Sequence, residues 1–301
     1  MKLATTTGDF FPYGLNDKES IAAVAQSGFK CIDYSFGYDF NHRCGLLGDN
    51  WRGFADELLE LSENLGVKFV QSHAPLGSPL VPDEKQESFI ADTKRSIEAA
   101  AYLGIPNIVV HSGYVKGMSA EETIERNAAF YFDILKTAEK SGITVLTENF
   151  NKMCLEDYYW IDAAEGLRKL LDRVNHPLLK ICWDVGHANL QEFSQEEELK
   201  MLGDRVAAVH IQDNFGYGDD HTIPFFGTLN IDSVMHGLID IGYNGYFTFE
   251  ATNAPVAASR RRSYEKDSRC SELPIEFHKK TEAMLYDIGK YILTQYDCFE
   301  Y

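Results

Sequence analysis

The sequence predicts a single (β/α)8 TIM barrel that occupies residues 1–301. One unit recurs along the whole chain: a short run of β-branched or aromatic residues, a loop, and an amphipathic helical segment. The strand-like runs are nearly continuously apolar, which is typical of parallel strands covered on both faces. A length of 301 residues is within the range of a one-domain α/β barrel, and no linker or low-complexity tract divides the chain.

The expected strands are short, and most are bounded by glycine, proline or polar residues. Their order along the chain, with a helical segment after each, is the order that a closed parallel barrel requires. In sequence order they are Lys2–Thr6, Phe29–Tyr34, Val67–His73, Asn107–His111, Ile143–Glu148, Leu179–Asp184, Val206–Ile211 and Tyr246–Glu250.

The expected helices are indicated by apolar spacing and by their end signals. Trp51–Leu65 carries apolar residues at helical spacing, and a second helix is expected near Glu84–Leu103. The S-x-x-E spacing of Ser119–Glu122 and of Ser194–Glu197 predicts capping boxes at two helix starts. Glycines stand after helices or before strands, where a left-handed stop is favoured, at Gly28, Gly66, Gly104, Gly142 and Gly245.

A doubly wound open sheet is the competing α/β architecture. It would usually carry a glycine-rich phosphate loop directly after the first strand. The chain has Thr7-Gly8-Asp9-Phe10 there, which does not have that pattern. The closed barrel is therefore the expected fold.

Charge and cysteine usage narrow the class of protein. The formal net charge of -18 opposes nucleic acid as a partner, because such binding depends on Lys and Arg neutralising phosphates. The basic run Arg260–Arg262 is interpreted as a solvated loop face. The six cysteines form no CxxC pair, so reduced thiols are expected. With no signal-peptide pattern and no apolar run of about 18 residues, a cytoplasmic protein without membrane contact is expected.

Six of the eight expected strands carry a carboxylate or an imidazole at the carboxyl end or one residue before it. The carboxyl ends of all strands share one rim of such a barrel, and active sites of this fold lie on that rim. A single residue of this kind is often structural, but six together favour a functional site. Carboxylates and imidazoles suit a divalent ion such as Mn, Zn, Co or Mg. The six residues are His73, His111, Glu148, Asp184, His210 and Glu250.

Further polar residues lie in loops expected on the same rim. His187 stands three residues after Asp184, near enough to reach a metal or a substrate oxygen. The Gly- and Asp-rich segment from Gln212 to Asn230 contains Asp219 and His221 and is expected to be a rim loop.

Local motifs at these strand ends resemble the xylose isomerase-like TIM barrel superfamily. That superfamily includes the sugar phosphate isomerase/epimerase group, ketose 3-epimerases, hydroxypyruvate isomerases and endonuclease IV. The resemblance extends from the first strand to the last. The motifs are HAP (73–75), VVHSG (109–113), TENF (147–150), CWDVGHA (182–188), VHIQD (209–213), DDHTIPFFG (219–227) and FE (249–250).

The resemblance implies a metal-dependent sugar isomerase or epimerase that acts on a small ketose, aldose or related polyol. Proton transfer would proceed through a metal-bound enediolate, with Glu148 and Glu250 as the acid/base pair. One metal ion is expected, and further ions are left open. The implied metal ligands are Glu148, Asp184, His210 and Glu250. The residues expected to contact substrate are His73, His111, His187 and His221.

Three alternatives stay open at this point. One is a metal-dependent lyase or dehydratase acting on a polyol or keto-inositol, which starts from the same proton abstraction. Another is a non-catalytic sugar-binding barrel. The third is an AP endonuclease resembling endonuclease IV, whose three-zinc set has counterparts at His73, His111, Glu148, Asp184, His187, His210, Asp219, His221 and Glu250.

The substrate pocket resembles the epimerases less than the metal site does. Lys152 stands where these relatives carry an Arg, Cys154 where they carry a Glu, and Asp220 near the place of another Arg. The identity of the sugar is therefore left open. Relatives often form homo-oligomers, so the resemblance leaves a homo-oligomer open, and the sequence does not fix the oligomeric state.

Overall fold

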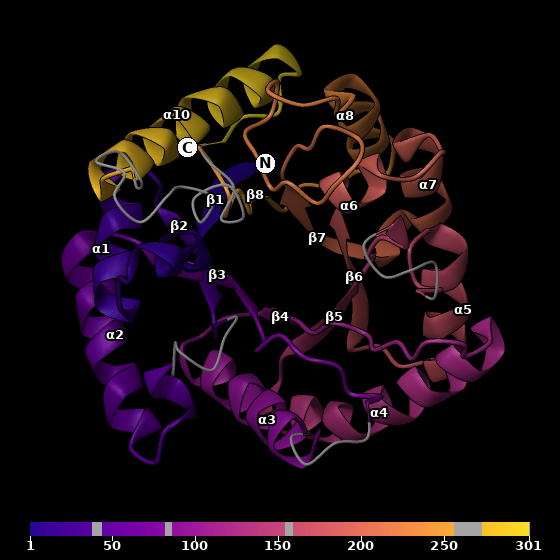
Figure 1. The fold of residues 1–301 in the computed structure, drawn as a ribbon. Coiled ribbons are helices and arrows are strands. Elements are labelled where there is room, and N and C mark those ends of the chain that lie inside the picture. Colours follow the sequence, from indigo (N-terminus) through magenta and orange to yellow (C-terminus); the bar gives the residue numbers. More distant parts are fainter. Residues whose placement is uncertain (38–43, 82–85, 154–158, 256–272, 301) are drawn as a thin grey trace, which may run out of the picture.

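Eight parallel strands close into a barrel with helices around it, as Figure 1 shows in a computed structural model. The structure describes residues 1–37, 44–81, 86–153, 159–255 and 273–300. The strands pair in sequence order and β1 closes on β8, which confirms the predicted (β/α)8 fold. They are β1 (Lys2–Thr6), β2 (Cys31–Ser35), β3 (Lys68–His73), β4 (Asn107–Val109), β5 (Thr144–Glu148), β6 (Leu179–Asp184), β7 (Val206–Ile211) and β8 (Tyr246–Phe249).

The surrounding helices follow the expected pattern, and none in the described chain is long and apolar enough to cross a membrane. The α-helices are α1 (Asp17–Gln26), α2 (Trp51–Leu65), α3 (Gln86–Tyr102), α4 (Ala120–Ser141), α5 (Ala164–Val174), α6 (Val185–Asn189), α7 (Gln195–Leu202), α8 (Ile231–Asp240) and α10 (Ile275–Gln295). Short 3-10 segments are η1 (Thr7–Tyr13), η2 (Gly45–Leu47) and η4 (Gly203–Arg205).

The helix ends test the serine caps and the glycine stops that the sequence predicts. Ser119 and Ser194 each cap a helix by accepting from the backbone N–H three residues on, at 3.2 and 3.5 Å. Gly28, Gly66, Gly104 and Gly142 have the positive φ of a left-handed stop. The prediction for Gly245 was wrong, because its backbone is not left-handed. A side chain there would instead meet the Tyr243 hydroxyl at 2.5 Å, so close approach requires the glycine.

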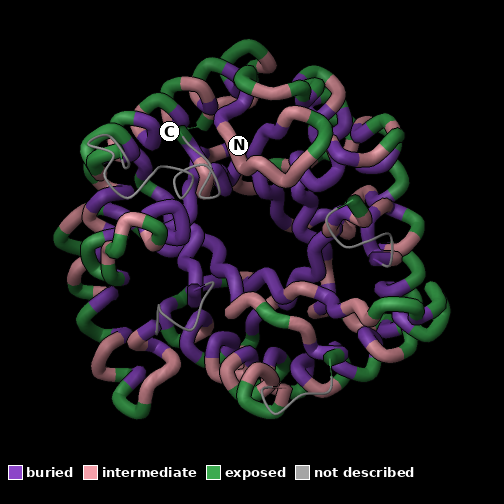
Figure 2. Tube along the Cα trace, in the orientation of Figure 1, coloured by how far each residue is buried: buried purple, intermediate pink, exposed green. Residues whose placement is uncertain are grey.

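The strands are buried on both sides and the helices expose their outer faces (Figure 2). The predicted strand ends at His111 and Glu250 were wrong, because β4 ends at Val109 and β8 ends at Phe249. Backbone hydrogen bonds still run one residue further, from Val110 to Leu146 and from Glu250 to Ile211. The chain then leaves the sheet, so these two side chains stand on the rim just beyond their strands.

A buried carboxyl pair joins the end of β1 to the C-terminal helix. Asp9 of η1 faces Glu282 of α10, and both side chains are fully buried. The Thr5 hydroxyl donates to Glu282 Oε2 at 3.1 Å. Burial raises the pKa of Glu282 to about 7, and burial together with repulsion from Glu282 raises the pKa of Asp9 well above its usual value. In the folded chain both carboxyl groups therefore keep their protons to a higher pH than free carboxyl groups do.

This pair predicts that stability falls as pH rises through about 7. The native state keeps protons that the unfolded chain loses near pH 4, so the contribution is complete below pH 4 and is lost as pH rises through 7. We expect Glu282→Gln, which keeps an uncharged hydrogen-bonding group, to reduce the fall in unfolding free energy between pH 5 and 8 by up to about 3 kcal/mol. Denaturant titrations at each pH measure it. Glu276→Gln, exposed on the same helix, is the control, and identical pH slopes in wild type and Glu282→Gln would contradict the raised pKa of Glu282.

Candidate metal centre

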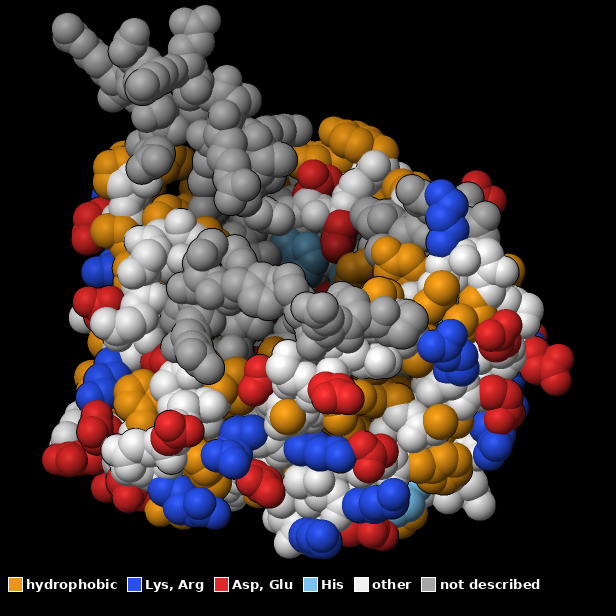
Figure 3. All heavy atoms as spheres, turned by 60° about the horizontal axis from the view of Figure 1, so that its bottom comes forward, with side chains coloured by type: hydrophobic (Ala, Val, Ile, Leu, Met, Phe, Trp, Pro, Cys, Tyr) orange, Lys and Arg blue, Asp and Glu red, His pale blue; other side chains and the backbone are white. Residues whose placement is uncertain are grey.

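The rim at the carboxyl ends of the strands holds a recess in which histidine and acidic side chains are visible, bordered by apolar side chains (Figure 3). All eight residues predicted for the site lie at this rim, and six of them are buried, whereas His111 and His221 are partly exposed. β3, β5, β6 and β7 supply His73, Glu148, Asp184 and His210. The other four residues are His111, His187, His221 and Glu250.

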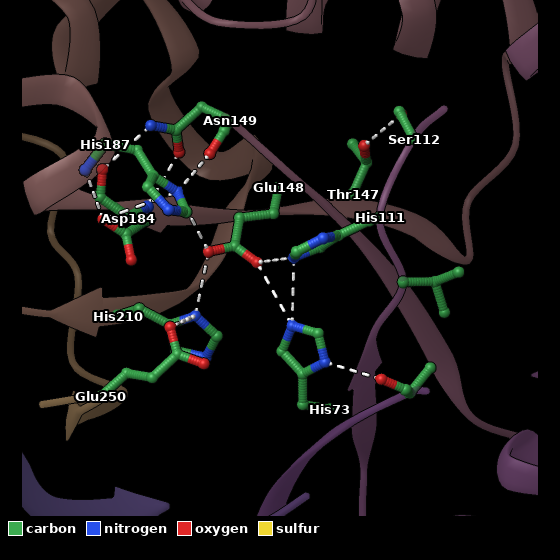
Figure 4. A network of polar contacts seen from close by, with 12 residues as sticks. His73, His111, Ser112, Thr147, Glu148, Asn149, Asp184, His187, His210 and Glu250 are labelled. Atoms are coloured by element: carbon green, nitrogen blue, oxygen red, sulfur yellow. Dashed lines mark hydrogen bonds and ion pairs between the residues drawn. The ribbon is translucent and has the colours of Figure 1, made fainter. Parts of the chain in front are cut away.

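Glu148 is the centre of the polar network in Figure 4. Its Oε2 lies 2.8 Å from His111 Nε2 and 3.6 Å from His73 Nε2. Its Oε1 lies 3.0 Å from His210 Nδ1 and 3.6 Å from His187 Nδ1. Each oxygen of the Glu148 carboxylate therefore lies close to two histidines.

The predicted ligand set is compact enough for one ion. Glu148, Asp184, His210 and Glu250 each offer one atom, and these four atoms lie within 4.8 Å of one another. The register that pairs Asp184 with His210 across β6 and β7 contributes to this convergence. Asp184 Oδ1 accepts from the His187 backbone N–H at 2.6 Å, whereas Oδ2 is buried with no hydrogen-bond partner among the described residues. An unsatisfied buried carboxylate oxygen beside three other ligand atoms fits a divalent cation.

Two flanking groups also have ligand character. His73 and His111 approach Glu148 on one side, and their Nε2 atoms are 3.1 Å apart. On the other side Asp219 bridges His187 and His221, at 3.3 Å from each Nε2. These two groups, together with the four-residue group, contain all nine metal-competent positions noted in the sequence.

Cys182 lies close to Glu148 and His210 but is a poor metal ligand. It stands on β6 opposite Glu148 in the sheet register. Burial raises the pKa of the Cys182 thiol to about 12, so the sulfur stays protonated. A protonated thiol binds metals weakly, and the oxygen and nitrogen donors dominate the site.

Neighbours of opposite charge hold Glu148 and His187 in their charged forms, whereas burial raises the pKa of Asp184 and lowers the pKa of His111. Burial opposes ionisation of Glu148, but His210 and His111 outweigh it and hold its pKa well below the usual range. Burial likewise opposes protonation of His187, yet Asp184 and Asp219 raise its pKa to about 10. For Asp184, burial raises the pKa to about 6. Imidazolium protons therefore balance the carboxylate charge here, and a bound cation would replace part of that balance.

Sequence reasoning missed two residues that shape the site, both inside the TENF motif. Asn149 bridges β5 to β6: its side chain donates to the Asp184 carbonyl at 2.9 Å and accepts from the Asp184 N–H at 2.8 Å. The Phe150 ring lies 4.3 Å from the His187 ring and 5.6 Å from the His111 ring, between ring centroids. Their position directly after a strand-end glutamate was the available signal.

The residues that the sequence placed in the substrate pocket make other contacts in the structure. Lys152 pairs with Asp162 at 3.2 Å and stacks on Trp160, so it is held by protein groups. Asp220 accepts from the Phe215 backbone N–H at 3.1 Å and orders the rim loop. Cys154 and the Arg260–Arg262 run lie outside the described residues.

The chain matches one protein family over most of its length and several known proteins at low identity. Residues 21–272 match the family described as xylose isomerase-like TIM barrel. Hydroxypyruvate isomerase of Escherichia coli is 23% identical over 234 residues, 74% of this chain and 83% of that protein. An uncharacterised Sinorhizobium fredii protein is 27% identical over 190 residues, 61% of this chain, and the match spans only 59% of its length.

Solved structures agree in fold. D-psicose 3-epimerase from Clostridium cellulolyticum superposes with a TM-score of 0.76 at 18% identity, covering 97% of this chain and 99% of that one. An AP endonuclease, family 2, from Brucella melitensis superposes with a TM-score of 0.65 at 18% identity, covering 82% and 91%. Identity at this level shows a shared barrel and leaves the reaction to the site itself.

Proposed function

The chain belongs to the xylose isomerase-like TIM barrel family, and from that membership and its rim geometry we propose that it is a divalent-metal-dependent sugar isomerase or epimerase. The observation that carries the proposal is the convergence of Glu148, Asp184, His210 and Glu250 beside an unsatisfied Asp184 oxygen. The sugar isomerases and epimerases among its relatives support a small polyhydroxylated substrate.

In the proposed reaction a proton moves between two carboxylates and a substrate carbon. A bound divalent cation would polarise the substrate carbonyl as a Lewis acid and acidify the adjacent C–H. Glu148 or Glu250 would take that proton, and the other would return one to the opposite face or to the neighbouring carbon. Both glutamates are nearly buried, which excludes water from the transfer.

Histidines are suited to hold the substrate in this scheme. His187 and His221 form one wall with Asp219, and their Nδ1 atoms are fixed by backbone carbonyls at 2.9 and 2.8 Å. His73 is fixed in the same way by the Ala74 carbonyl, at 2.8 Å. With Nδ1 held by the main chain, Nε2 of each ring is kept for a second partner, which is Asp219 for His187 and His221 and His111 for His73, and which would include sugar hydroxyls in the proposed complex.

Deuterium exchange tests this proposal without knowledge of the sugar. The protein, loaded in turn with Mn²⁺, Co²⁺, Mg²⁺ or Zn²⁺, is incubated with a panel of ketoses, aldoses and inositols in D₂O. We expect one sugar to gain deuterium at a carbon next to its carbonyl and to yield an isomer, as followed by NMR and mass spectrometry. Deuterium uptake with loss of water would indicate a lyase or dehydratase. Tight binding with no exchange and no turnover would support a non-catalytic binding barrel.

A second candidate is an AP endonuclease, favoured by one observation. Two of the three groups of possible ligands contain Glu148, and the third, formed by His187, Asp219 and His221, lies beside it. The rim therefore has donors for more than one ion. Multi-metal sites are typical of phosphoester hydrolysis. The net charge of -18 opposes a DNA substrate, which makes this the lesser candidate. Metal stoichiometry separates the two.

A further inference from the structure

Asp33 is a buried carboxylate in the barrel interior that the proposed proton transfer does not use. It lies on β2, and its side chain is 1% exposed. Its Oδ2 accepts from Gln71 Nε2 at 2.8 Å and lies 3.2 Å from Nε2 of His210 on β7. Because β2 and β7 are not neighbours in the barrel, this contact crosses the interior.

The two nitrogens of His210 face different partners. Nδ1 lies 3.0 Å from Glu148 Oε1 and 3.6 Å from Glu250 Oε2, whereas Nε2 faces Asp33. An imidazole binds a cation through a nitrogen lone pair, so a neutral ligand carries its proton on the other nitrogen. If Nδ1 joins the carboxylates around a cation, the proton must stay on Nε2, where Asp33 Oδ2 is placed to accept it.

We propose that Asp33 is a positioning residue for the metal centre. It accepts the Nε2 proton of His210, which selects the tautomer with a free Nδ1 and fixes the plane of the ring. A carboxylate in this role also makes the imidazole a stronger ligand. Gln71, on the adjacent strand β3, orients Asp33 by donating to the same oxygen. The inference rests on the metal site proposed above.

A purely structural role explains Asp33 poorly. Its other oxygen, Oδ1, is buried without a hydrogen-bond partner in the part of the chain that the structure describes. An ionised carboxylate in such a place is costly, and an apolar residue would fill the barrel interior without that cost. The need for a proton acceptor behind His210 accounts for the charge.

A competing arrangement gives Gln71 the central role. Gln71 Nε2 also lies 2.8 Å from His210 Nε2. If the amide donated to an unprotonated Nε2, His210 would carry its proton on Nδ1 and could not bind a cation there. The position of the imidazole proton therefore separates the two arrangements.

The first test observes that proton in the wild-type chain. The full-length protein is labelled with ¹⁵N at histidine, loaded with Zn²⁺ and studied by proton–nitrogen NMR. We expect His210 Nε2 to carry a proton protected from exchange and Nδ1 to have the shift of a metal-bound nitrogen. Binding through Nε2, or a wild-type chain that takes up no metal, would overturn the inference. No variant needs to fold for this measurement.

The second test removes the charge. Asp33→Asn should weaken Zn²⁺ binding, measured by chelator competition, by about 10- to 100-fold. The control is Asp17→Asn, another buried carboxylate, which accepts from the Gly45 N–H at 3.4 Å. We expect Asp17→Asn to change Zn²⁺ affinity little. Without metal, the melting temperature of Asp33→Asn should differ from that of the wild type by no more than the melting temperature of Asp17→Asn does. Unchanged affinity in Asp33→Asn overturns the inference. Wild-type metal binding without turnover of any sugar would count against the proposed function alone.

Discussion

Replacing either rim glutamate by glutamine should abolish most turnover. Glu148→Gln and Glu250→Gln keep the shape of the side chain but remove the group that accepts or returns the proton. Acid/base groups of this kind contribute roughly 100- to 10,000-fold, and we expect kcat to fall within that range in each variant. Each glutamate also lies within 3.6 Å of His210 Nδ1, so metal affinity should fall as well. The assay is deuterium exchange on the sugar identified in D₂O.

The two effects can be separated by metal concentration. If only binding were impaired, excess Mn²⁺ or Co²⁺ would restore kcat, whereas loss of the acid/base group persists at saturation. Glu165→Gln provides the control, because Glu165 is exposed and pairs with Lys169 at 2.5 Å on α5. Variants that bind metal and keep full activity would refute the assignment of the two glutamates.

The fold could be predicted because its signals are local and repeated. Continuous apolar runs indicated the strands. Helical spacing and end signals identified the helix Trp51–Leu65 at both of its ends. The strand-end residues followed from one rule of the fold, that all strand ends share a rim. The rule tolerated the errors at His111 and Glu250, because both residues still stand on that rim.

The residues that hold the metal-site side chains in place were harder to predict, because their contacts join strands that are distant in the sequence. Asp33 and Gln71 are single polar residues within otherwise buried strands, and only the closed barrel brings them to His210. A charged residue in the middle of a buried strand was a usable signal for Asp33. For Asn149 the signal was its position directly after Glu148, but its two hydrogen bonds to the Asp184 backbone could be known only from the β5–β6 register.

Removing two carboxylates of the four-residue group should eliminate bound metal. In protein purified without added metal, mass spectrometry of the wild type should find about one Mn, Zn, Co or Mg ion per chain. The double variant Glu148→Gln/Asp184→Asn should bind none, because two of the three carboxylate ligands, including the unsatisfied Asp184 Oδ2, lose their charge. The matched control is Glu165→Gln/Asp172→Asn, which changes exposed residues paired with Lys169 and Arg205.

The number of ions decides between the two candidate functions. One ion that raises the melting temperature and is lost in the double variant supports the isomerase or epimerase, since ligand binding stabilises the native state. Two or three zinc ions would mean that His73 with His111, and His187 with His221, also act as ligands, and would call for cleavage assays on abasic DNA. Because all of the groups meet at or beside Glu148, the double variant should then lose more than one ion. No metal under any loading condition would refute the metal centre, and the carboxylates would have to keep their charge balance through imidazolium protons alone.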